Sequence, residues 1–373
     1  MKKILFLTGT RADFGKIKSL IQILDDHQDF EVFVFVTGMH LQKEYGYTLI
    51  EIERCQFKNV HTFENHTHET TMDLTLAKTI EGLSAYVKEI NPDLIVVHGD
   101  RVETLAGAIV GSLNNILVAH IEGGELSGTV DELIRHSVSK LSHIHFVSNA
   151  EAAKRLKQMG EIESSIFTIG SPDIDIMFSD DLPELSIVKE YYAIPFEKFA
   201  VVMFHPVTTE VKQMQQYAEN FVKSLVADSH NYVVIFPNND LGSQFIIEEY
   251  QKLKDNPRFR IFPSLRFEYF LTLLKSSQFI IGNSSAGIRE APYYGIPIIN
   301  IGTRQQNRAV HADIINVGYE LESIQEALMV IDTHKIQMSD ADYGKGNSTE
   351  LFLECLQKSN VWKLNHQKQF RDT

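Results

Sequence analysis

Short apolar runs, each followed by a polar turn and then by a stretch with helical spacing, recur along the chain. Runs rich in Ile, Val, Leu and Phe predict buried β-strands. The first run ends at a turn, after which Ile17, Leu20, Ile21 and Leu24 recur at helical spacing. Strands are predicted at 4–7, 31–36, 94–97, 116–120, 143–147, 165–169, 199–204, 232–236, 279–281 and 297–301. Strict alternation of strand and helix predicts an α/β fold with parallel sheets.

The helices that the pattern predicts include 70–90, 104–113, 150–159, 288–294 and 351–370. Between 170 and 198 the alternation loosens, and Pro172, Pro183 and Pro195 interrupt it, which favours a linker. A chain of 373 residues also exceeds what one hydrophobic core supports. We therefore expect two Rossmann-like domains, 1–175 and 176–355, and a C-terminal helical segment, 356–373, that packs back on the first domain.

Net charge and cysteine content restrict the classes of binding partner and the cellular compartment that we expect. The formal net charge of −14 argues against a nucleic-acid or anionic-membrane partner. Cys55 and Cys355 have no paired spacing, which favours a reducing cytoplasm. The apolar run at 4–7 is too short for a secretory signal, and no run approaches the ~20 residues of a membrane span. We expect a cytoplasmic protein.

Carboxylates follow two neighbouring predicted strands. Asp100 comes directly after the strand at 94–97, Glu122 follows the strand at 116–120, and Asp131 opens the next helix. The carboxyl ends of parallel strands share one edge, so we expect Asp100 and Glu122 on one rim. Helix capping or ion pairing with Arg101 or Arg135 is the alternative role for these acids. It explains Glu122 poorly, because Glu122 stands between Ile121 and the Gly123-Gly124 pair at the end of a strand that is expected to be buried. Burial would raise the pKa of Glu122 and make it a usable acid or base near neutrality.

A second polar set follows the strands of the second domain. His205 ends a strand and precedes Pro206, and Ser284 and Ser285 precede the predicted helix at 288–294. The serines suit a diphosphate at a helix N-terminus, although a simple N-cap is the alternative. Three arginines at strand ends could neutralise phosphates, namely Arg11, Arg101 and Arg304. Two domains with polar rims suggest an active site in the interdomain cleft.

Metal-binding patterns are weak. Five histidines have no metal-ligand spacing and are each interpreted as structural, namely His98, His120, His136, His143 and His145. Asp173 and Asp175 form a DxD triplet, but the triplet lies in the predicted linker, and we interpret it as structural. We expect no metal site.

The polar motifs together resemble one family. They are Gly9-Thr10-Arg11-Ala12-Asp13, His98-Gly99-Asp100-Arg101, His120-Ile121-Glu122-Gly123-Gly124-Glu125, Phe204-His205-Pro206, Gly282-Asn283-Ser284-Ser285 and Gly302-Thr303-Arg304. In order and spacing they resemble the hydrolysing UDP-N-acetylglucosamine 2-epimerases of bacterial sialic acid and legionaminic acid biosynthesis, along nearly the whole chain. That resemblance implies two Rossmann-like domains in the GT-B arrangement, with the nucleotide sugar between them.

The resemblance also implies a reaction without metal or redox cofactor. UDP would leave from C1 while a base removes the C2 proton, and water would add to the glycal intermediate to give N-acetylmannosamine. Asp100, Glu122 and Asp131 would be the acid and base carboxylates, and His205 would lie near the reacting centre or the departing phosphate. The UDP-binding residues would be Arg11, Arg101, Asn238, Ser284, Ser285, Glu290 and Arg304, with a backbone contact from Leu265 to the uracil. Family members commonly form homodimers or homotetramers.

Other functions stay open. Relatives of the legionaminic acid route act on UDP-2,4-diacetamido-2,4,6-trideoxyglucose, and the stretch 113–120 is as close to that branch. The non-hydrolysing epimerases typically carry Pro-Glu where this chain has Ala12-Asp13, which favours hydrolysis. A GT-B glycosyltransferase or a non-catalytic nucleotide-sugar sensor would not need Asp100, Glu122 and Asp131 for removal of a C2 proton.

Overall fold

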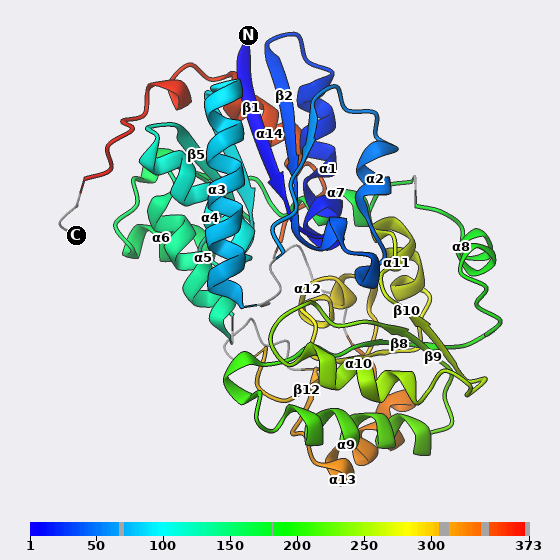
Figure 1. The fold of residues 1–373 in the computed structure, drawn as a ribbon. Coiled ribbons are helices and arrows are strands. Elements are labelled where there is room, and N and C mark those ends of the chain that lie inside the picture. Colours follow the sequence, from blue (N-terminus) through cyan, green and yellow to red (C-terminus); the bar gives the residue numbers. More distant parts are fainter. Residues whose placement is uncertain (67–70, 128, 181, 306–312, 337–342, 370–373) are drawn as a thin grey trace. The chain divides into compact units, whose positions relative to one another are not determined.

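The chain divides into two compact units. The computed structural model describes residues 1–66, 71–127, 129–180, 182–305, 313–336 and 343–369. Unit 1 contains the described residues of 1–125, 131–179 and 341–373, and unit 2 contains those of 126–130 and 180–340. Each unit has a parallel sheet flanked by helices, which confirms the predicted α/β class with two Rossmann-like domains (Figure 1).

Unit 1 contains, in its described residues, a seven-stranded parallel sheet with the order β3-β2-β1-β4-β5-β6-β7. The strands are β1 (Lys2–Thr8), β2 (Phe30–Val36), β3 (Val60–Thr62), β4 (Leu94–His98), β5 (Leu117–Ile121), β6 (Ile144–Val147) and β7 (Ile166–Thr168). Every residue of β4 and β5 is buried, because helices cover both faces of the sheet. Their register pairs His98 with Ile121, so Asp100 and Glu122 leave the sheet from adjacent strands.

The helices of unit 1 connect these strands. They are α1 (Arg11–Asp25), α2 (Leu49–Glu53), α3 (Met72–Ile90), α4 (Val102–Leu113), α5 (Val130–Leu141), α6 (Ala150–Gln158) and α7 (Pro172–Met177), with short 3₁₀ turns η1 (Gly38–Leu41), η2 (Lys43–Tyr45) and η3 (Glu163–Ser165). Helix α4 packs directly on the sheet at two glycines. A Cβ at Gly107 would lie 2.5 Å from Val97, and one at Gly111 would lie 2.3 Å from Val118.

The end of the chain completes the core of unit 1. Helix α14 (Ser348–Gln357) places Phe352 at ring-centroid distances of 6.4 Å from Phe6 and 4.8 Å from Phe146. Asp175 accepts hydrogen bonds from the backbone N–H groups of Ser348 (3.0 Å) and Thr349 (2.8 Å), which satisfies donors in the first turn of α14. Segments far apart in sequence therefore share one core. A last 3₁₀ turn, η7 (Val361–Lys363), follows.

Unit 2 contains, in the part of the chain that the structure describes, a six-stranded parallel sheet with the order β10-β9-β8-β11-β12-β13. The strands are β8 (Ala200–Met203), β9 (Tyr232–Ile235), β10 (Phe259–Phe262), β11 (Ile280–Gly282), β12 (Ile298–Ile301) and β13 (Ile315–Val317). The helices are α8 (Leu185–Tyr191), α9 (Met214–Ala227), α10 (Ser243–Gln251), α11 (Phe267–Lys275), α12 (Ala286–Arg289) and α13 (Leu321–Val330), with η4 (Thr208–Glu210), η5 (Ala291–Tyr294) and η6 (Ile331–Thr333). Phe204, Phe221, Tyr232 and Phe279 lie fully buried in its core.

Three predicted elements differ from the structure. The helix predicted at 288–294 is divided into α12 and η5 around Glu290, where Pro292 prevents a continuous helix. The helix predicted at 351–370 ends at Gln357, and Phe370 lies outside the described residues. The predicted linker at 170–198 contains α7 and α8, and the predicted boundaries at 175/176 and 355/356 fall within α7 and α14. Thr70, predicted to begin α3, also lies outside the described residues.

Among the described helices, none combines the length and the apolar character needed to cross a membrane.

Candidate active site

One guanidinium group connects the loops that follow β4 and β5 in unit 1. Arg135 of α5 donates through Nη2 to Asp100 Oδ2 and through Nη1 to the backbone oxygen of Glu122, the latter at 2.6 Å. Only 4% of the Arg135 side chain is exposed. The structure thus brings Asp100 and Glu122 to one rim, and Arg135 holds both loops.

Glu122 adopts a conformation that is rare for residues with a Cβ. Its φ is +63°, and its side chain is almost completely buried. Oε1 accepts a hydrogen bond from Ser171 Oγ, and Oε2 lies 3.3 Å from Nε2 of His98. A strained backbone with a buried carboxylate between two polar partners is typical of a functional site.

A buried ion pair lies next to Glu122. Lys16 Nζ is 2.9 Å from Asp173 Oδ2 and 3.8 Å from Glu122 Oε1. Asp173 is fully buried, and Asp175 binds the start of α14, so the two acids of the DxD triplet contact different groups of the protein. Sequence reasoning did not find Lys16 or Ser171. The sequence signal for Lys16 was a lysine in the second turn of α1, on a helix face that is otherwise largely apolar.

Asp131 lies in the first turn of α5, one helical turn before Arg135. It is buried, with 7% of the residue exposed. Its predicted acid–base role stays a prediction, as do the roles of Asp100 and Glu122.

The first loop carries Arg11 two residues before Asp13, whose carboxylate is buried. Asp13 accepts hydrogen bonds from the backbone N–H groups of Gly9 (3.1 Å) and Thr10 (3.2 Å), and its backbone N–H bonds to Thr10 Oγ1, which completes a capping box at α1. Burial raises the pKa of the Asp13 carboxyl, while the Thr8 hydroxyl opposes that shift. Arg11 Nη2 lies 3.6 Å from Glu51 Oε1.

Arg101 follows Asp100 at the start of α4. Its Nε lies 4.0 Å from Oε2 of the buried Glu103, whose other oxygen is 3.4 Å from Asn65 Nδ2. The arginine thus has an acidic neighbour within unit 1, as Arg11 has.

His120 fits the structural role that the sequence predicted. Its Nε2 donates to the backbone oxygen of Gly99 at 2.8 Å, because a carbonyl can only accept, and Nδ1 then accepts from Ser139 Oγ at 3.0 Å. Burial lowers the pKa of His120 to about 3, so the ring is neutral at physiological pH. Burial lowers the pKa of His145 as well, and its ring contacts Glu161 at 3.0 Å. In the described residues, no group of three or more His, Cys, Asp or Glu side chains has a metal-binding arrangement.

Asn283 connects the strand-end loops of unit 2. Its side chain accepts from the backbone N–H of His205 at 2.6 Å and donates to the backbone oxygen of His205 at 2.9 Å. Nδ1 of His205 accepts from the backbone N–H of Asn238 at 3.0 Å, so in the neutral ring the proton is on Nε2. The structure therefore brings the predicted residues His205 and Asn238 together.

The loop after β12 contacts the same asparagine. Arg304 Nη1 and Gln305 Nε2 donate to the backbone oxygen of Asn283, at 3.4 and 2.7 Å. Sequence reasoning did not assign Asn283 or Gln305, because a backbone acceptor leaves no signal in residue type.

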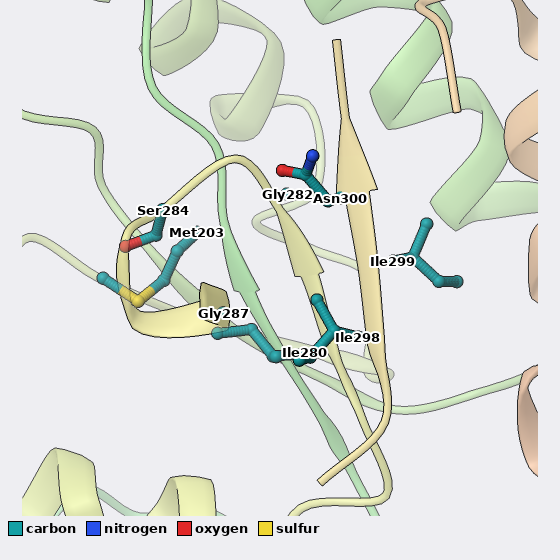
Figure 2. A pocket seen from close by; sticks show the side chains of 8 residues that line it. All are labelled: Met203, Ile280, Gly282, Ser284, Gly287, Ile298, Ile299 and Asn300. Atoms are coloured by element: carbon teal, nitrogen blue, oxygen red, sulfur yellow. The ribbon is translucent and has the colours of Figure 1, made fainter. Parts of the chain in front are cut away.

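A small pocket lies beneath the loop that carries Ser284 and Ser285. In Figure 2, Ser284 and Met203 lie on one side of it and Asn300 on the other. Its lining residues are Met203, Ile280, Gly282, Ser284, Gly287, Ile298, Ile299 and Asn300. Ser285 occupies the N-cap of α12 but makes no side-chain capping bond. The four residues of α12 have a weaker dipole than the longer helix predicted, so phosphate binding here would rely on side chains and single N–H groups.

Leu265 and Glu290, the remaining predicted residues, are both buried. Leu265 lies between β10 and α11, and Glu290 lies between α12 and η5. Both are within unit 2, and their predicted contacts with UDP stay predictions.

Two α/β units with polar strand-end loops define a two-domain protein of the Rossmann-like class. A solved structure with the same fold is UDP-GlcNAc 2-epimerase of Methanocaldococcus jannaschii in complex with UDP-GlcNAc and UDP. Its TM-score is 0.80 at 22% identity, over 95% of this chain and 99% of that chain.

The sequence comparisons identify the family. The family model for UDP-N-acetylglucosamine 2-epimerase matches residues 22–357. UDP-N-acetylglucosamine 2-epimerase of Neisseria meningitidis serogroup B is 49% identical, over 100% of this chain and 99% of its own. UDP-N,N'-diacetylbacillosamine 2-epimerase (hydrolyzing) of Legionella pneumophila is 33% identical, over 95% of this chain and 96% of its own. This chain belongs to the UDP-N-acetylglucosamine 2-epimerase family, which confirms the predicted resemblance at the level of the family.

Proposed function

We propose that this protein is a hydrolysing UDP-N-acetylglucosamine 2-epimerase, which converts UDP-N-acetylglucosamine and water to N-acetylmannosamine and UDP. The relative of 49% identity bears the name of this substrate, and the relative of 33% identity is named as hydrolysing. The product would enter nonulosonic acid biosynthesis.

The arrangement of Asp100, Glu122 and Arg135 carries the proposal. The reaction begins with removal of the C2 proton by a base and cleavage of the C1–O bond to UDP. It ends when water adds a hydroxyl to C1 and a proton to C2 from the opposite face. That sequence needs a base and an acid in one site. Asp100 and Glu122 supply such a pair, because they lie on neighbouring strand-end loops and one buried guanidinium bonds the Asp100 carboxylate and the backbone oxygen of Glu122.

The loops of unit 2 would bind UDP. His205, Ser284 and Arg304 lie on loops that Asn283 and its neighbours hold together at the carboxyl ends of β8, β11 and β12. Arg304 supplies a cation for the diphosphate, and His205 offers an Nε2–H to a phosphate oxygen. In this proposal Glu290 accepts hydrogen bonds from the ribose hydroxyls, and Leu265 makes a backbone contact with the uracil.

A second substrate has its own support. The Legionella relative is named for UDP-N,N'-diacetylbacillosamine, which carries an acetamido group at C4 and no oxygen at C6. The same elimination and hydration would act on that sugar, because the bonds that change are at C1 and C2.

The test is a proton NMR time course in deuterated buffer, with UDP-N-acetylglucosamine and UDP-N,N'-diacetylbacillosamine in separate tubes. We expect UDP and a free manno-configured sugar that is deuterated at C2, and the faster tube identifies the substrate. A UDP-linked epimer would instead establish the non-hydrolysing reaction. Transfer of the sugar to an acceptor, or binding of UDP without turnover, would favour a transferase or a sensor.

Variants assign the carboxylates. Asp100→Asn, Glu122→Gln and Asp131→Asn should each lower kcat by ~10²-fold or more if the acid transfers a proton. Glu132→Gln is the matched control, since Glu132 neighbours Asp131 on α5, and its side chain is 35% exposed beside His136. A carboxylate whose amide variant retains wild-type kcat is excluded from the proton transfers.

A further inference from the structure

We propose that Glu210 is a positioning residue that fixes the Arg304 loop for binding of the UDP diphosphate. The inference rests on the proposed function, since it assigns the geometry of the same site. Glu210 lies in η4, five residues after His205, and no motif of the sequence singled it out.

Both carboxylate oxygens of Glu210 are used. Oε1 accepts from Thr303 Oγ1 at 2.6 Å, and Oε2 accepts from the Tyr319 hydroxyl at 2.9 Å. The carboxylate therefore binds the residue directly before Arg304 and the hydroxyl of Tyr319, whose ring packs against Gly302.

The ring of Tyr319 determines the shape of the turn. Gly302 has a φ of +72°, and a Cβ at this position would lie 2.0 Å from Tyr319 Cζ, so the backbone passes directly over the phenol. Tyr217 stacks on the ring of Tyr319 at a centroid distance of 3.7 Å and an interplanar angle of 5°. The backbone N–H of Thr303 lies 3.4 Å from the Tyr319 hydroxyl. The turn is held against a rigid aromatic pair, and Glu210 orients the hydroxyl at its edge.

Two loops that are not neighbours in the sheet are joined in this way. Glu210 follows β8 and Thr303 follows β12, while β11 lies between these strands. Asn283 at the end of β11 contacts His205 on one side and Arg304 on the other. Glu210 and Asn283 together thus connect the loops that follow β8, β11 and β12, which are the proposed phosphate-binding loops. Loss of the Glu210 carboxylate would remove the bond to Thr303, which directly precedes Arg304 in a Gly-containing turn.

The experiment is isothermal titration calorimetry of the full chain with UDP and with uridine. We expect Glu210→Ala to weaken UDP binding about ten-fold or more, because a charge-assisted pair of hydrogen bonds is lost at the loop that carries a phosphate ligand. Uridine lacks phosphates, so its affinity should change less than about two-fold. Glu210→Gln should recover part of the UDP affinity, since its amide oxygen still accepts one hydroxyl.

Two further variants separate positioning from folding. Tyr319→Phe keeps the ring under Gly302 and removes only the hydroxyl, so it serves as the test if Glu210→Ala does not fold. It should weaken UDP binding by about two- to five-fold, and the double variant should be no weaker than Glu210→Ala alone. Glu219→Ala on α9 removes the same charge from an exposed pair with Lys223, and it should bind UDP as the wild type does.

The outcomes are distinct. UDP binding by Glu210→Ala within about two-fold of the wild type overturns the inference, and so does an equal loss of UDP and uridine affinity, which would indicate a structural role only. A wild-type chain that binds neither UDP nor a UDP-sugar overturns the proposed function together with this inference.

Discussion

Arg135→Lys tests whether one buried guanidinium holds the rim of unit 1 that carries Asp100 and Glu122. A lysine has a single nitrogen, which reaches either the carboxylate of Asp100 or the backbone oxygen of Glu122, whereas arginine bonds both. The exposed fractions are 4% for the Arg135 side chain and 19% for that of Asp100, so solvent compensates the lost bonds only in part. We expect the substitution to cost about 2–4 kcal/mol of folding free energy.

Differential scanning calorimetry measures this cost. In a domain of this size the change corresponds to a decrease in Tm of roughly 4–16 °C. Lys223→Met breaks an exposed ion pair of unit 2, in which 58% of the lysine side chain is exposed, and should change the Tm by less than about 2 °C. The scans are run at one rate, because a two-unit protein can unfold irreversibly.

The same variant should also lose turnover. The proposed role of Asp100 in proton transfer depends on its position, so kcat should fall by ~10²-fold or more even at temperatures where the variant is folded. An Arg135→Lys protein that melts within about 2 °C of the wild type and retains its kcat would refute the reasoning that Arg135 connects the two loops.

Three further predictions concern stability. Gly111→Ala should cost about 1–3 kcal/mol in chemical denaturation, because the new methyl would lie 2.3 Å from Val118; an unchanged midpoint would contradict the close packing of α4. Asp175→Ala should cost about 1 kcal/mol and increase amide exchange in the first turn of α14, whose N–H groups it caps. Burial lowers the pKa of both His40 and His120 to about 3, below their value in the unfolded chain. Folding stability should therefore decrease as the pH falls from about 6.5 towards 3, by up to ~1.4 kcal/mol per pH unit for each histidine, and His40→Asn should reduce this slope in a denaturation series.

The buried parts of the fold were predictable because their sequence signal is strong. Strands β4 and β5 lie in the middle of their sheet, and their unbroken apolar runs mark them clearly. The strands β3, β10 and β13, which the pattern did not predict, lie at sheet edges. Strand β3 is Val-His-Thr and is largely exposed, so it has no buried apolar positions from which a sequence pattern could predict it. Its pairing with β2 is what defines it as a strand.

The sequence predicted candidate residues of the site, but it did not predict which side chains contact them. Strand-end acids and arginines stood out because turns expose residue types that a core would not tolerate. Their partners did not stand out, since Arg135 contacts Asp100 across 35 positions, and Ser171 contacts Glu122 across 49. Pairings over such distances depend on the register of the sheet and on where each helix begins.

In both units, side chains from other parts of the chain hold the loops at the strand ends. A loop at the carboxyl end of a parallel strand has no ladder to hold it, so its geometry depends on side chains from other loops. In unit 1 the guanidinium of Arg135 supplies donors to two loops. In unit 2 the amide of Asn283 supplies a donor and an acceptor, and the carboxylate of Glu210 supplies two acceptors. Substitution of a motif residue such as Arg304 removes a candidate ligand, whereas substitution of Glu210 leaves every candidate ligand in place. A loss of UDP affinity in the second case would therefore measure the contribution of loop geometry alone.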